Sequence, residues 1–248
     1  MRATLHSLTE AQAREAMPFF STDMLSRLFG GRNASGAGPA TEAAAATDEL
    51  GSGDEEVAQQ VLSLIALSSS MVARFYALTY VTPDDRESGL AWQLAERAVQ
   101  LCRGSAGSSD GLLAETLHHY GVAAASCAQV KGLGLMGQAA AAQLPPASEI
   151  FASGDSALVE AIELRQGVEL ALSTAARAEL YYCAASANSQ GAGAFDGATV
   201  DKLIKQSIEL NREAVAKLET AAADGYELEL ATVLKDLGKV LGYAHRVG

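Results

Sequence analysis

Apolar residues recur every three or four positions through most of the chain, and Gly or Pro interrupts the pattern at intervals. The segment from Asp54 to about Tyr80, for example, places Val57, Val61, Ile65 and Val72 on one face of a helix. No alternation of apolar and polar residues is long enough to require a strand. The pattern therefore predicts an all-α protein.

The composition favours close packing between helices. Hydrophobic residues make up 49% of the 248 residues, but aromatic residues make up only 6% and alanine is abundant. A core of such small side chains suits helices better than a β-sandwich. We expect an antiparallel helical array of five to six main helices. After the first, they are predicted at about 84–103, 110–131 (resuming to Leu144), 156–190, 199–223 and 226–243.

The chain divides into three parts by composition. Residues 1–31 predict short amphipathic helices, the second of which carries Met24, Leu25, Leu28 and Phe29. Residues 32–53 are mostly Gly, Ala, Ser and Thr and predict a flexible linker. Residues 54–248 form the helical array domain. Because a short apolar helix on a tether must dock somewhere, we expect it to bind a partner, and docking on its own array stays open.

A pair of histidines stands out in ETLHHYGVAAASCAQVK, residues 115–131. Adjacent helical residues point about 100° apart, so His118 and His119 cannot both face one metal ion. The same-face positions counted forward from them, such as Val122 and Ala123, are not ligands. The row of small residues that follows lets another helix approach closely: Gly121, Ala124, Ala125 and Ala128. We therefore expect a buried seam, without a metal or cofactor.

Two other candidate motifs lack their structural context. Residues 132–137, GLGLMG, fit the dinucleotide pattern GxGxxG, but they follow a predicted helix where that mechanism needs a strand. The carboxylates Glu160, Glu163 and Glu169 lack the Glu-x-x-His partner of a di-metal bundle. We interpret these carboxylates as solvated charges.

Charge and cysteine usage limit the partners and the compartment. The formal net charge of −12 excludes binding to nucleic acid or anionic lipid through a general basic surface. Cys102, Cys127 and Cys183 lie far apart and predict reduced core residues. The stretch 111–144 carries too many polar residues to predict a membrane span. We expect a cytoplasmic protein; organelle targeting and membrane association through a partner stay open.

Several helices resemble those of known helical solenoids. LAWQLAERAVQL (residues 90–101) and VDKLIKQSIEL (residues 200–210) resemble second helices of tetratricopeptide pairs, although no clean 34-residue period is present. VLSLIALSSS (61–70), the helix at 89–102, and AELYYCAA (178–185) followed by FDG (195–197) resemble the Bro1 domain in order. The chain is shorter than Bro1 domains and lacks their N-terminal β-portion. The resemblance implies an adaptor in endosomal sorting.

The sequence thus favours a non-enzymatic protein–protein interaction module, a scaffold or a subunit of a larger assembly. No acid, base or nucleophile has a recognisable catalytic partner. The alternative is an enzyme or ligand carrier with a pocket between helices near His118/His119 and Tyr181/Tyr182. The residues predicted to bind a protein partner are Met24, Leu25, Leu28, Phe29, Tyr181 and Tyr182.

Overall fold

The computed structural model describes residues 52–77, 87–105, 108–188, 195–221 and 225–247. These residues form helices and no strand, which confirms the all-α prediction. The predicted helices at 1–31, with Met24, Leu25, Leu28 and Phe29, lie outside the described residues, as does the predicted linker as far as Gly51.

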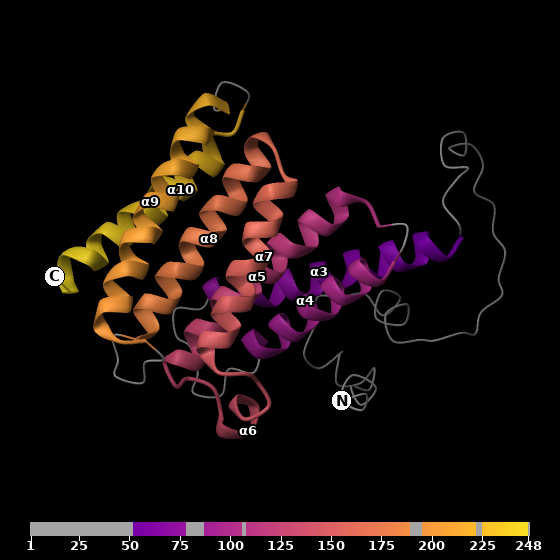
Figure 1. The fold of residues 1–248 in the computed structure, drawn as a ribbon, viewed down its shortest axis with the longest axis horizontal. Coiled ribbons are helices and arrows are strands. Elements are labelled where there is room, and N and C mark those ends of the chain that lie inside the picture. Colours follow the sequence, from indigo (N-terminus) through magenta and orange to yellow (C-terminus); the bar gives the residue numbers. More distant parts are fainter. Residues whose placement is uncertain (1–51, 78–86, 106–107, 189–194, 222–224, 248) are drawn as a thin grey trace. The chain divides into compact units, whose positions relative to one another are not determined.

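The helices follow one another with short connections (Figure 1). In the described ranges there are eight, of which all but α6 have at least 18 residues: α3 (Ser52–Ala77), α4 (Glu87–Gly104), α5 (Asp110–Gly132), α6 (Gln138–Ala141), α7 (Ala147–Leu164), α8 (Gly167–Asn188), α9 (Gly197–Ala221) and α10 (Glu227–Val247).

The array has a core on each side of its central helices. α3 and α4 pack with the start of α5 around Val61, Ile65 and Cys102, whereas α8, α9 and α10 pack around Leu218 and Val233. Between them, α5 contacts α3, α4, α7 and α8, and it is apolar on almost all sides. A helix that is apolar all round must be buried, and α5 is the centre of the domain.

The structure corrects one predicted helix. The segment predicted as a single helix at 156–190 is broken: α7 already begins at Ala147, directly after Pro146, and ends at Leu164. The backbone of Arg165 is extended, and Gly167 has a positive φ of 56°. A left-handed residue cannot continue an α-helix, and glycine adopts that conformation without a steric penalty. Asp155, the residue directly before the predicted start, therefore lies inside α7.

The row of small residues in α5 allows close helix packing, as predicted. A Cβ added at Gly121 would overlap the side chain of Leu158 in α7. In the opposite direction, a Cβ added at Gly154 of α7 would overlap that of Ala124 in α5. The two glycines thus set the close approach of α5 and α7.

The described part of the chain holds one helical window, Glu56–Ala73 in α3, whose length and composition would suffice to cross a bilayer. Two serines in this window make polar contacts inside the domain. The Ser68 hydroxyl donates to the carbonyl of Ala91 at 2.9 Å, and Ser69 Oγ lies 2.9 Å from Nδ1 of His119. These contacts join α3 to α4 and α5. Cys102, Cys127 and Cys183 are buried and form no disulfide.

Candidate functional site

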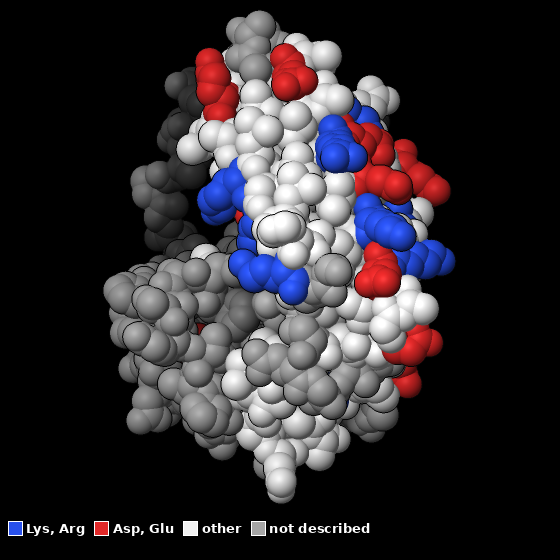
Figure 2. Space-filling view, turned by 90° about the vertical axis from the view of Figure 1, so that its left-hand side faces the viewer, with Lys and Arg blue, Asp and Glu red and all other residues white. Residues whose placement is uncertain are grey.

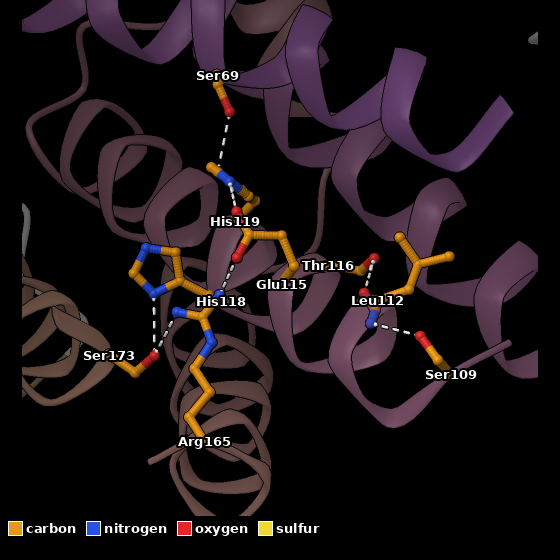
Figure 3. Close-up of polar contacts among 9 residues, drawn as sticks. All are labelled: Ser69, Ser109, Leu112, Glu115, Thr116, His118, His119, Arg165 and Ser173. Atoms are coloured by element: carbon orange, nitrogen blue, oxygen red, sulfur yellow. Dashed lines mark hydrogen bonds and ion pairs between the residues drawn. The ribbon is translucent and has the colours of Figure 1, made fainter. Parts of the chain in front are cut away.

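The two histidines belong to one polar cluster, in which Glu115 is the central residue (Figure 3). Nε2 of His119 lies 2.8 Å from Oε1 of Glu115, one turn earlier on α5. Because an ionised carboxylate only accepts, Nε2 carries the hydrogen and donates it. Nδ1 of His119 meets the Ser69 hydroxyl of α3. His119 thus ties α5 to α3.

The other half of the cluster is built around Arg165. Its side chain is 5% exposed and forms an ion pair with Oε2 of Glu115. Its Nη1 donates to Ser173 Oγ of α8 at 2.9 Å, and that oxygen lies 3.2 Å from Nδ1 of His118. The Ser173 hydroxyl therefore joins Arg165 to His118, and it has a hydrogen of its own and a second acceptor site for the contact with His118. Arg165 lies in the connection between α7 and α8, and its side chain is buried there.

The charges of the cluster follow from these contacts. The hydrogen bond from His119 lowers the pKa of Glu115 to about 2, against the opposing effect of burial and with help from the charge of Arg165. Burial and then the positive charge of Arg165 lower the pKa of His118 to about 3. At neutral pH, Glu115 is therefore a carboxylate and His118 is a neutral imidazole.

The contacts of the cluster direct the two histidines toward different helices. The His118 and His119 rings meet edge to face, with centroids 5.3 Å apart, and their Nδ1 atoms face hydroxyls on different helices. Within the described ranges, no group of three or more His, Cys, Asp or Glu side chains could hold a metal ion. The cluster joins α3, α5, α8 and the α7–α8 connection.

The sequence analysis missed Glu115 and Arg165. Glu115 could have been found, because it lies four residues before His119, where helical side chains meet. Arg165 could not, because it is 50 residues from Glu115 and its pairing depends on how α5 and α7 pack.

Tyr181 and Tyr182 contact different helices, Tyr181 through its hydroxyl and Tyr182 through its ring. The Tyr181 hydroxyl donates to Asp155 Oδ2 at 3.2 Å, beside the Arg177–Asp155 ion pair. The Tyr182 ring packs edge to face on Tyr243, and Nζ of Lys239 lies 4.3 Å from its centre. Their exposures are 6% and 9%, so partner binding through these rings stays a prediction that their burial does not support.

Tyr181 and the histidine cluster contact α8 at different levels. Tyr181 lies eight residues beyond Ser173 on α8, which corresponds to about 12 Å along the helix axis. The contacts of Tyr181 are with α7 and with its own helix, whereas Ser173 contacts the histidine cluster. A ligand pocket near both pairs stays a prediction, and these polar contacts do not join the two pairs.

A groove that the sequence analysis did not identify lies between α5, α8 and α10, with a volume of about 330 Å³. Its walls are apolar and come from all three helices: Val122, Ala125, Leu172, Ala175, Ala176, Leu228 and Val233. Leu228 is 76% exposed at the groove's edge. An apolar hollow bordered by so exposed a leucine is typical of a binding surface.

Three carboxylates line the same groove: Glu179, Glu229 and Asp236. Oε1 of Glu179 accepts a hydrogen bond from Lys239 at 2.8 Å, but none of the described residues donates to its buried Oε2. Burial raises the pKa of Glu179, and the charge of Lys239 only partly opposes this shift. The groove is therefore apolar, and its negative charge comes from Glu229 and Asp236, beyond the Glu179–Lys239 pair.

Figure 2 shows the side of the molecule on which α9 and α10 lie, where uncharged surface runs between charged side chains.

The chain matches no protein-family model, no curated protein and no solved structure.

Proposed function

We propose that residues 52–247 form a protein–protein interaction module, in which the groove between α5, α8 and α10 binds an amphipathic helix of a partner. The observation that carries the proposal is the combination of apolar walls with three carboxylates in one groove. Apolar anchors at helical spacing would enter between Leu172 and Val233, and Lys or Arg beside them would face Glu229 and Asp236.

The size of the groove supports a helix as the occupant. A volume of about 330 Å³ is at the lower limit of small-molecule pockets, whereas a bound helix inserts only a few anchor side chains. In such interfaces a few buried anchors supply most of the affinity, and the acidic border selects for a basic partner.

The packing of consecutive helices in the array is consistent with a tetratricopeptide-like or Bro1-like arrangement. In that arrangement the domain would act as a scaffold, and the endosomal-sorting role implied by the resemblance stays a prediction. The N-terminal segment with Met24, Leu25, Leu28 and Phe29 would provide a second contact.

Reversing the charge of the groove is expected to weaken peptide binding at least tenfold. The probe is a labelled amphipathic peptide of about 18 residues, with leucine on one face and lysine on the other, and fluorescence anisotropy measures its Kd. The groove variant is Glu229→Lys with Asp236→Lys. The exposed carboxylates of α9 offer a matched control with the same charge change, Asp201→Lys with Glu209→Lys.

The control is expected to change Kd less than twofold at physiological salt, because screening restricts exposed charges to about 8 Å. A second variant, Ala176→Phe, fills the groove without changing its charge and should also weaken binding. If both charge variants weaken binding equally, the peptide recognises the net charge of the protein and the proposal fails.

A further inference from the structure

The side of α10 that faces away from the groove carries a second pattern. Six residues, separated by 4, 3, 4, 3 and 4 positions, share one face of the helix. All six are exposed: Glu227, Ala231, Leu234, Gly238, Leu241 and His245. We call this set the α10 stripe. Its spacing is that of the contact positions in a coiled coil. The groove residues Glu229 and Asp236 of α10 lie on the opposite side of the helix.

The leucines of the α10 stripe are exposed to a degree that the fold does not require. Leu234 is 46% exposed and Leu241 is 41% exposed. They lie one heptad apart, so a single helix could cover both.

The glycine in the stripe has no packing role within the domain. A Cβ added at Gly238, or at the neighbouring Gly242, would meet no atom within 4 Å. Glycine inside an exposed helix costs about 1 kcal/mol relative to alanine. Elsewhere in the domain, Gly121 and Gly154 allow two helices to approach closely, but Gly238 has no such neighbour in the described chain. The open surface at Gly238 suits a helix from outside the domain.

The order of residues in the stripe is self-complementary. When two copies of α10 lie antiparallel about a two-fold axis near residue 236, Leu234 faces Gly238 of the second copy. Leu241 then faces Ala231, and Glu227 faces His245. Each large side chain meets a small one, each carboxylate meets an imidazole, and the two-fold axis repeats every contact.

We propose that the α10 stripe is an interface between two copies of this chain, paired antiparallel. The antiparallel direction also places the acidic first turn of each helix, with Glu227 and Glu229, near the basic last turn of the other, with His245 and Arg246. Opposed helix dipoles add to this attraction.

The size of the stripe determines the strength of the association. A helix of 21 residues is about 32 Å long and about 10 Å wide, so the contact covers roughly 320 Å² of each copy. Stable dimers bury roughly 800 Å² per partner, and a net charge of −12 on each copy adds repulsion. We therefore expect a reversible dimer with a Kd on the order of 100 µM, measured at about 0.3 M salt to screen the repulsion.

Sedimentation equilibrium of the full chain from about 5 µM to 1 mM tests the proposal. Leu234→Glu is expected to weaken the dimer at least tenfold, whereas Leu228→Glu, the same change on the groove side of α10, should leave it unchanged. Gly238→Ala should raise Tm by about 2–4 °C and yet weaken the dimer, because the added methyl group lies under Leu234 of the second copy. If Gly238 affected only the stability of the monomer, Gly238→Ala would change Tm without weakening the dimer.

An exchange of the end residues tests the antiparallel register. Glu227→His alone places two histidines together and should weaken the dimer, and adding His245→Glu should restore it, because the same pair forms in reverse. A chain that remains monomeric to 1 mM, or a dimer that Leu234→Glu leaves intact, would overturn the proposal. The outcome is independent of peptide binding in the groove, which Leu228→Glu alters and Leu234→Glu does not.

Discussion

Acid is expected to destabilise the domain through His118 well above the pH at which exposed carboxylates are protonated. In the folded protein its pKa is lowered from 6.5 to about 3, chiefly by burial and then by Arg165 and His119, while Glu115 opposes the shift. The unfolded chain therefore binds a proton that the folded chain does not. The stability is complete above pH 6.5 and is lost as the pH falls toward 3, by an amount on the order of 4 kcal/mol.

Urea unfolding followed by circular dichroism between about pH 7 and pH 4 measures this loss. His118→Leu should be less stable at pH 7 but should lose much less stability on acidification, because the titrating group is gone. The matched control is His245→Leu, at the exposed end of α10, which should retain the dependence of the wild type. Equal acid slopes in the wild type and in His118→Leu would show that His118 does not cause the loss.

Gly121→Ala is expected to destabilise the domain by about 2 kcal/mol, although alanine normally stabilises a helix. The new methyl group would overlap Cγ and both Cδ atoms of Leu158, which is fully buried and cannot move aside without shifting α7. Overpacking costs about 1–3 kcal/mol, and an overlap with three atoms of a fully buried leucine lies at the upper end of that range. Subtracting the roughly 1 kcal/mol that alanine gains over glycine in a helix leaves about 2 kcal/mol.

A second glycine of the same helix is the control for this prediction. A Cβ at Gly111 would be 3.9 Å from its nearest neighbour, Ser109 Oγ, so Gly111→Ala should leave stability unchanged or increase it slightly. Urea midpoints with unchanged slopes give both values. If Gly121→Ala proves as stable as Gly111→Ala, α5 and α7 are not packed through this glycine.

The helices could be predicted from the sequence because each depends on a local pattern. The apolar period at 54–80 predicted a helix that the structure contains as α3. The small residues after His119 predicted the close contact that α5 makes with α7. The break between α7 and α8 was missed because no proline marks it, and a single glycine at 167 is compatible with a helix in sequence terms.

The candidate sites depend on contacts between distant segments, which a single sequence does not reveal. The Glu115–Arg165 pair spans 50 residues, and the groove exists only where α10 crosses the contact of α5 with α8. Tyr181 and Tyr182 were predicted to bind a partner, but they pack against α7 and α10. By contrast, the spacing of the α10 stripe was present in the sequence, and only its exposure required the structure.

Methyl NMR of the full chain, titrated with the basic amphipathic peptide, tests the proposed interaction module most directly. We predict that the resonances of Val122, Leu172 and Val233, which line the groove on three different helices, shift together and saturate with one affinity. The methyl resonances of Leu234 and Leu241, on the other side of α10, should stay in place. Shifts confined to Leu234 and Leu241, or no saturable shift in the groove, would contradict the proposed function.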